Sequence, residues 1–359
     1  MAQEGVPIIR GYGVEDVREL ARSAWRRTGG KAAFIDLHGM EGLTGMYVGE
    51  IPPGAALHPE RHLHEEVTCI LEGSGATEVW LPNREAEKQT FEWQKGSLFA
   101  PPLNCWHRMH NGGREPVVYL AVTSAPLVFD LFRDEKFIFD SDHFFPSRYL
   151  PRPDYFKSEE RFLSEMEGDT GMVWVTNLIS DVRGATIDPV KKKGAGVKIT
   201  CFEMSGNGLV GHLAEWPVGR YHKAHHHGGG AVLLIWRSRG YTLMWPQEAG
   251  VQPFAQGRED RVVRVDWKEG AVFSPPTGWF HQHFNTGSEA ALQLAIRWGS
   301  QRYDVGFSKA MRGTGVYTSY REGGTLIEYE DEDPRIRADF ELELRQDDLK
   351  SSMPAVAYR

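Results

Sequence analysis

Cysteine is scarce in this chain, and its placement excludes two common kinds of structural staple. The three cysteines, Cys69, Cys105 and Cys201, are scattered and odd in number. Thiols at these spacings form neither a disulfide framework nor the Cys-x-x-Cys pair of a zinc or redox site. The count predicts buried thiols in a reducing compartment.

The chain also lacks a block of basic residues and long apolar runs. The 41 Lys and Arg residues stand against 49 Asp and Glu residues, for a net charge of -8, and no basic block occurs. A nucleic-acid partner is therefore not expected. The N-terminal residues lack the apolar core of a signal peptide, and no stretch has 18 consecutive apolar residues. We expect a cytoplasmic protein that binds a small molecule and no membrane.

Several well-known catalytic motifs are absent too. The sequence has no GxGxxG or Walker phosphate loop, no GxSxG nucleophile elbow and no HExxH zinc helix. The sequence therefore gives no support for binding of a dinucleotide or nucleotide, or for the chemistry of serine hydrolases and zincins.

Short strand-like runs dominate what remains. Runs such as EEVTCIL, VVYLAV, AVLLIW and LQLAIRW are rich in β-branched and aromatic residues and are separated by Gly, Pro and Asn. That rhythm is typical of antiparallel sandwiches or barrels and predicts an all-β protein. Helical spacing occurs at residues 14–27, with Val17, Leu20, Ala21 and Trp25 on one stripe, and again in the C-terminal run RIRADFELELRQDD.

The length of 359 residues predicts more than one core. We expect five segments: an N-terminal helical arm at 1–32, a first barrel at 33–125, an inter-barrel segment at 126–195, a second barrel at 196–300 and a C-terminal extension with a helix at 301–359.

An internal repeat is the main signal. The blocks GSLFAPPLNCWHRMHN and GAVFSPPTGWFHQHFN share Gly, Pro, His and Asn at the same offsets, with His107 and His281 in equivalent places. Upstream, a second pair of blocks aligns Gly54, Glu60, His62 and Glu66 with Gly219, His225, His227 and Ala231. Most of the 14 histidines fall in these four blocks, so the halves are duplicated domains.

Strand geometry turns this pattern into a candidate metal site. Residues two apart on a strand face the same side, so His225 and His227 project into one barrel, and His281 from another strand can join them. Three neutral imidazoles suit iron, zinc, copper or nickel and leave coordination positions open. By the same parity His283 faces the site, as a substrate contact or proton shuttle. Arg297 is either a clamp for a substrate carboxylate or an outward-facing surface residue.

In the first half, Glu60, His62, Glu66 and His107 could form a second, two-histidine, two-carboxylate site suited to manganese or iron. His58 and His64 could substitute as ligands there. The alternative is a disused site in which Glu60 pairs with Arg61 or Arg108.

The blocks resemble the two motifs of the cupin superfamily, G-x5-H-x-H-x3-E-x6-G and G-x5-P-x-G-x2-H-x3-N, so the chain resembles a bicupin. Residues 270–285 match the second motif throughout, whereas the first half has Asn104 in place of a Gly. In the first motif, Glu60 replaces a His, Ala231 replaces the Glu and Ser238 replaces the closing Gly. The resemblance implies a double-stranded β-helix, or jelly roll, in each half, a metal near the barrel mouth and a homo-oligomer.

Ala231 stands where the family has a Glu, so no carboxylate ligand would offset the double positive charge of the metal. That charge favours an anionic substrate and dioxygen. By resemblance to cupin dioxygenases, we hypothesise a non-haem iron(II) dioxygenase acting on a small anionic substrate, which could be aromatic, with O2 as cosubstrate. Manganese, nickel or zinc could replace iron. The alternatives are a cupin-type metal-dependent decarboxylase, isomerase or lyase, and a non-catalytic small-molecule-binding bicupin.

Overall fold

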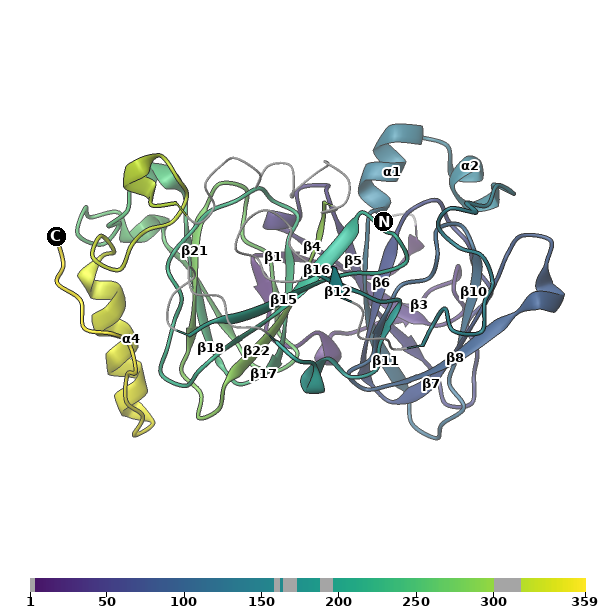
Figure 1. Cartoon of the computed structure of the whole chain (residues 1–359), viewed down its shortest axis with the longest axis horizontal. Coiled ribbons are helices and arrows are strands. Elements are labelled where there is room, and N and C mark those ends of the chain that lie inside the picture. Colours follow the sequence, from purple (N-terminus) through teal and green to yellow (C-terminus); the bar gives the residue numbers. More distant parts are fainter. Residues whose placement is uncertain (1–3, 158–161, 164–172, 188–195, 300–317) are drawn as a thin grey trace.

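The computed structural model describes residues 4–157, 162–163, 173–187, 196–299 and 318–359. Within them the chain forms two β-barrels that lie side by side, the first built mainly from the N-terminal half and the second from the C-terminal half (Figure 1). Each barrel combines a large sheet with a small one. The expected all-β class with two jelly-roll domains is confirmed.

The first barrel has a large sheet in the order β1-β4-β5-β11-β6-β9-β14, with β3 paired to β4, and a small sheet in the order β10-β7-β8. The bounds are β1 (Ile8–Gly11), β3 (Ser23–Ala24), β4 (Lys31–Leu37), β5 (Gly45–Ile51), β6 (Glu66–Glu72), β7 (Ser74–Trp80), β8 (Gln89–Gln94), β9 (Leu98–Phe99), β10 (Trp106–His110), β11 (Val117–Thr123) and β14 (Leu178–Ile179).

The second barrel repeats this plan, with a large sheet in the order β12-β13-β15-β16-β22-β17-β20-β2 and a small sheet in the order β19-β18-β21. The bounds are β2 (Gly13–Val14), β12 (Phe162–Leu163), β13 (Val173–Val175), β15 (Lys198–Glu203), β16 (Leu209–Trp216), β17 (Val232–Arg237), β18 (Gly240–Trp245), β19 (Val263–Trp267), β20 (Val272–Phe273), β21 (Phe280–Asn285) and β22 (Ala291–Trp298).

In the described ranges α-helices are few: two lie on top of the first barrel, and one lies at the end of the molecule beside the second barrel (Figure 1). The α-helices are α1 (Ala125–Phe132), α2 (Glu135–Asp140) and α4 (Pro334–Gln346). Short 3-10 turns are η2 (Val17–Glu19), η3 (His38–Met40), η4 (Glu85–Glu87), η5 (Val182–Gly184), η6 (Gln247–Ala249), η7 (Glu259–Arg261) and η8 (Tyr320–Glu322). The expected C-terminal helix is confirmed as α4. Among the helices in the described ranges, none has the length and apolar composition needed to span a membrane.

The central strands are buried on both faces. Every residue of β11 is buried, and in β22 all but the last are. One set of alternate residues in β22, including Leu294 and Ile296, joins a core with Val48 and Leu120 of the first barrel. The other set faces the interior of its own barrel. The large sheets therefore pack against each other through their outer faces, as in a β-sandwich, and enclose separate interiors.

The barrels exchange short edge strands. The N-terminal β2 leaves the first barrel and pairs with β20 of the second. In return, β14 pairs with β9 of the first barrel, with Leu178 opposite Phe99. Each exchanged strand covers the edge of a sheet that would otherwise expose unpaired backbone groups.

The helix expected within residues 1–32 is wrong. Apart from residues 1–3, which lie outside the described ranges, this segment forms β1, β2, η2 and β3. The apolar residues at helical spacing do not form one helix face, because they enter different cores. Val17 packs between the barrels, whereas Trp25 packs inside the first barrel. Pairing of β1 with β4 and of β2 with β20 outweighs the local helical spacing.

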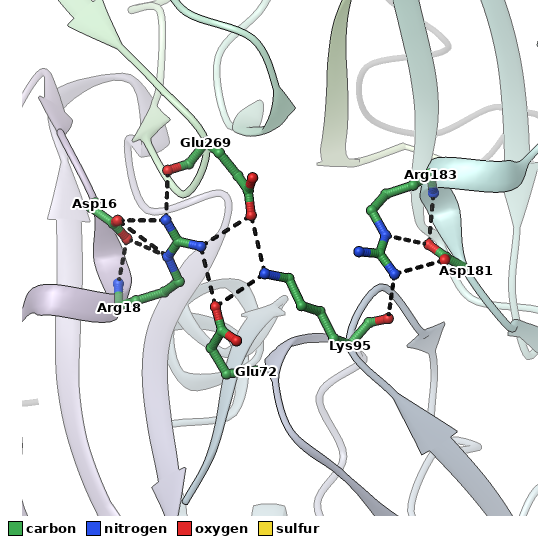
Figure 2. A network of polar contacts seen from close by, with 7 residues as sticks. All are labelled: Asp16, Arg18, Glu72, Lys95, Asp181, Arg183 and Glu269. Atoms are coloured by element: carbon green, nitrogen blue, oxygen red, sulfur yellow. Dashed lines mark hydrogen bonds and ion pairs between the residues drawn. The ribbon is translucent and has the colours of Figure 1, made fainter.

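A polar network fixes the exchanged N-terminal segment at the junction of the barrels (Figure 2). The Arg18 guanidinium pairs with Asp16 at 2.7 Å and reaches Glu72 of the first barrel and Glu269 of the second at 3.2 and 3.1 Å. Lys95 also bridges Glu72 and Glu269. Burial opposes ionisation of Asp16, but the hydrogen bonds and charge of Arg18 outweigh burial and lower its pKa.

The same Asp-Val-Arg arrangement follows β14, where Arg183 pairs with Asp181 at 2.8 Å (Figure 2). Each aspartate packs on the glycine that opens a repeated block. A Cβ on Gly270 would lie 2.4 Å from Asp16, and one on Gly96 would lie 2.3 Å from Asp181. Both glycines also have positive φ, so the repeat requires glycine at these positions.

The C-terminal extension packs on the outside of the second barrel around a buried carboxyl group. Glu332 is 2% exposed and accepts hydrogen bonds from the Tyr221 hydroxyl and, at 3.0 Å, from the Gln282 amide on β21. Burial raises the pKa of Glu332 to about 7, although these two hydrogen bonds and the charge of Arg337 act in the opposite direction.

We predict unequal effects from removing the two equivalent aspartates. Asp16→Ala should lower the unfolding free energy by about 1–3 kcal/mol, because it strips a buried, charge-assisted set of hydrogen bonds. Asp181→Ala is the matched control and should cost less, because its side chain is 31% exposed, against 4% for Asp16. Urea unfolding of the full chain measures both, and equal losses would contradict the role assigned to Asp16.

We predict a pH-dependent stability from Glu332. Its pKa is raised on folding, so its favourable contribution is complete below about pH 4.5 and is lost as the pH rises through about 7. The loss is about 3 kcal/mol, from a pKa difference of about 2.5 at about 1.4 kcal/mol for each pKa unit. Thermal unfolding between pH 4.5 and 8 should show this slope, and Glu332→Gln should flatten it. Asp339→Asn, which changes a half-exposed carboxylate of α4, should keep the slope.

Candidate metal centre

Three histidines of the second barrel converge. His225 and His281 pair through their backbones, with N to O distances of 3.2 and 2.9 Å in the two directions. This bridge places their rings side by side, and His227, two residues further on, joins the same side. One ring nitrogen from each of His225, His227 and His281 lies within 4.8 Å of the other two. The residues selected by the repeat are thus close enough together to share one ion.

Backbone carbonyls set the orientation of all three rings. Nδ1 of His225 lies 3.2 Å from the Lys223 carbonyl oxygen, and Nδ1 of His281 lies 3.1 Å from that of Trp279. Nδ1 of His227 lies 2.7 Å from the Gly228 carbonyl oxygen. A carbonyl oxygen accepts only from N–H, so each Nδ1 carries a proton and each Nε2 presents a lone pair. Such partners fix the tautomer of metal-binding histidines.

The walls around this cluster come from alternate residues of the large sheet. The histidines border a cavity of about 30 Å³ whose walls include Ala214, Ala231, Leu233, Gln293 and Ala295. A cavity of this size holds a water molecule or dioxygen. His225 and His281 are buried, whereas His227 is only half-buried, so the more accessible side of the cluster is at His227.

Arg297 and His283 both lie on this cavity. The Arg297 side chain is not on the outer surface: the residue is 6% exposed and donates from Nη1 to Nδ1 of His212 at 2.7 Å. His283 is also buried, and its Nδ1 lies 2.8 Å from the Thr242 hydroxyl, which accepts a hydrogen bond from the Trp267 indole.

Sequence reasoning selected neither His212 nor His222 for the site, and both line the cavity. His212 lies on β16 outside the repeated blocks, where it faces Ala295 of β22. In the first barrel the corresponding pair is Tyr47 and Ala121. Extending the repeat to these strands would have revealed His212. His226 does not line the cavity and packs instead against Phe280.

The first barrel holds its candidate residues more loosely around a larger space. Nε2 of His62 lies 3.9 Å from Glu66, and Nε2 of His107 lies 3.8 Å from Glu60. Both histidines again direct Nδ1 to carbonyl oxygens, of His64 and Cys105. Within the described residues, both Nε2 atoms are buried without a hydrogen-bond partner.

Electrostatics in this barrel favour neutral side chains. Burial, reinforced by the charge of Glu66, raises the pKa of Glu60 to about 8. Burial likewise raises the pKa of Glu66 to about 7 and lowers that of His107 to about 4. Glu60, His62 and Glu66, but not His107, border a cavity of about 320 Å³ with largely apolar walls that include Trp25, Met46 and Phe129.

Two further expectations for the first barrel have clear outcomes. The alternative in which Glu60 pairs with Arg61 or Arg108 is wrong, because Arg61 pairs with Asp142 and Arg108 pairs with Glu78. His64 lines the cavity and stacks on His62 with ring centroids 3.6 Å apart, whereas His58 is exposed.

Comparisons with known proteins agree with this architecture. Residues 47–123 match the cupin domain family. The match lies within the first barrel, and the repeated blocks and the second barrel agree with the resemblance of the chain to a bicupin. Gentisate 1,2-dioxygenase from a Ralstonia species is 31% identical over 97 residues. That match covers 26% of this chain and 26% of the relative, so it is local.

Similar solved structures include mutants of Bacillus subtilis oxalate decarboxylase. A single-substitution mutant gives a TM-score of 0.49 and a two-residue deletion mutant gives 0.48. Both are 14% identical to this chain, and each comparison covers 81% of this chain and 78% of the decarboxylase. A structure from work on the Mn(II) centres of the same decarboxylase gives a TM-score of 0.48 at 13% identity.

Proposed function

We propose that the chain is a metal-dependent enzyme with its metal at His225, His227 and His281, and that it acts as a non-haem iron(II) dioxygenase on a small anionic substrate. The observation that carries this is the convergence of three imidazoles whose Nδ1 protons are already used by carbonyl oxygens. Three imidazole nitrogens this close together form a donor set that a divalent first-row metal takes.

The surroundings of the cluster favour an anionic ligand. Among the described residues that line this cavity, none is a carboxylate, and Arg297 contributes a guanidinium. Three neutral ligands would leave a bound metal with its full double charge and with open positions. In such a site iron(II) would supply the binding and activation of dioxygen.

The side chains then have separable roles. Arg297 would orient the anionic group of the substrate, because its planar fork matches a carboxylate. His283, held by Thr242, would donate or accept a proton beside the substrate. The local likeness to gentisate 1,2-dioxygenase supports an aromatic acid as the substrate class. With only about 30 Å³ inside the cavity, an aromatic ring would have to approach from the side of His227.

We predict that His225→Ala or His281→Ala removes the metal. Metal content should fall from about one equivalent per chain to near zero in the second barrel, and oxygen uptake with aromatic acids such as gentisate should fall with it. The matched control is His226→Ala, which changes a neighbouring histidine that packs against Phe280 outside the cavity. Protein purified anaerobically that holds only manganese or zinc, with turnover indifferent to oxygen, would rule out the dioxygenase.

A second candidate function is favoured by the first barrel. A metal held by His62 and His107 with Glu60 or Glu66 would serve a decarboxylase, isomerase or lyase, with the other carboxyl group as acid or base. Two buried imidazole Nε2 atoms without partners in the described chain, next to a cavity of about 320 Å³, support it.

Separate variants discriminate the two candidates. If the second barrel carries the reaction, we expect His62→Ala to keep most of the turnover and His225→Ala to abolish it. Activity lost only in His62→Ala would favour the first barrel. A well-folded chain that retains no metal in either barrel would favour a non-catalytic binding protein.

A further inference from the structure

A loop of the first barrel contacts both metal-ligand segments of the second. This clasp loop, residues 38–44, connects β4 to β5. Its Gly39 carbonyl accepts a hydrogen bond from the Gly230 amide at 2.7 Å, and its Thr44 hydroxyl donates to the Gly230 carbonyl at 3.0 Å. The clasp loop thus fixes the turn that directly follows His227.

Glu41 of the clasp loop binds the other ligand segment. Its carboxylate accepts a hydrogen bond from the Thr277 amide at 2.7 Å and another from the Thr277 hydroxyl. Thr277 lies in the turn that precedes His281, and the Gly278 amide in turn donates to the His227 carbonyl at 2.9 Å. Glu41 therefore acts where the two ligand segments meet.

The packing leaves no room between these parts. A Cβ on Gly229 would lie 2.4 Å from the Thr277 hydroxyl and 2.9 Å from the Glu41 carboxylate. A Cβ on Gly39 would lie 2.3 Å from the Ser274 carbonyl oxygen. Glycine at these two places lets the clasp loop reach the backbone of both ligand segments.

The second barrel makes the equivalent contact with the first. The loop between β15 and β16 places the Ser205 hydroxyl 2.7 Å from the Ala100 carbonyl oxygen. At the end of that loop, the amides of Gly208 and Leu209 donate to Glu65 at 2.9 and 2.8 Å.

The contacted positions agree within the repeat. Ala100 and Ser274 have the same offset from Gly96 and Gly270, and Glu65 and Gly230 have the same offset from Gly54 and Gly219. Each barrel thus contacts equivalent positions of the other barrel, although different side chains make the contacts.

We propose that Glu41 is a positioning residue for the metal centre of the second barrel, supplied by the first barrel. It holds the turn before His281 against the turn after His227 and so sets the spacing of two metal ligands. This inference rests on the proposed three-histidine site. Glu41 does not line the cavity, so it acts through Thr277 and Gly229.

The test is Co(II) binding to the metal-free full chain, followed by visible absorption that reports coordination geometry. Loss of the bands in His225→Ala assigns them to the second barrel. Glu41→Ala should weaken Co(II) binding about tenfold and shift the bands, as loss of an outer partner of metal ligands does. Glu41→Gln should restore both, because its amide can accept from the Thr277 amide and donate to the Thr277 hydroxyl.

Asp36→Ala is the matched control, since it removes a carboxylate of the same hairpin that pairs with Arg10 near solvent. It should bind Co(II) like the unchanged chain. Equal affinity and spectra in Glu41→Ala and the unchanged chain would overturn the positioning role while leaving the metal site intact. So would failure of Glu41→Gln to restore binding. Absence of second-barrel bands in the unchanged chain would overturn the metal site and this inference with it.

Discussion

Burial of the central strands on both faces is the constraint on which the molecule depends. In β22, Leu294 and Ile296 pack into the core between the barrels, whereas Gln293, Ala295 and Arg297 face the histidine cavity. A shift of one residue in register would exchange these two sets. The apolar core between the sheets therefore fixes which side chains enter the site, even though it does not touch the site itself. The same alternation in β11 fixes the first barrel.

The two barrels are joined by more than this apolar core. Strands β2 and β14 cross between them, and each is followed by an aspartate that packs on the opening glycine of a repeated block. The loops between the first core strands then contact the histidine-bearing blocks of the opposite barrel. Each candidate site is consequently supported by backbone from both halves of the chain. Duplication has thus produced two barrels that are joined by strands, loops and a shared apolar core.

Spacing in the sequence predicted the fold and the central residues of the site, because it reflects local strand geometry. His225 and His227 are two apart on one side, and the turn before His281 repeats a turn of the first half. What depends on tertiary partners was not predictable. Val17 and Trp25 look like one helical face but enter different cores. The sequence of β22 could not show whether Arg297 faces the barrel interior or the outside, because a strand buried on both faces shows no alternation of polar and apolar residues. His212 was missed since it lies outside the repeated blocks.

The same framework has acquired opposite electrostatics in its two interiors. At equivalent places the first barrel has Tyr47, Glu66 and Thr123, and the second has His212, Ala231 and Arg297. In the first barrel, carboxyl groups lie beside the imidazoles. Tyr47 donates a hydrogen bond to one of them, Glu66, and burial raises the pKa of Glu66. In the second, a guanidinium stands beside imidazoles alone. The first set can balance a cation only if its buried carboxyl groups ionise, whereas the second needs an anion to balance the charge of Arg297 and of any metal. Divergence after duplication therefore changed what charge each barrel can hold while leaving the placement of its histidines unchanged.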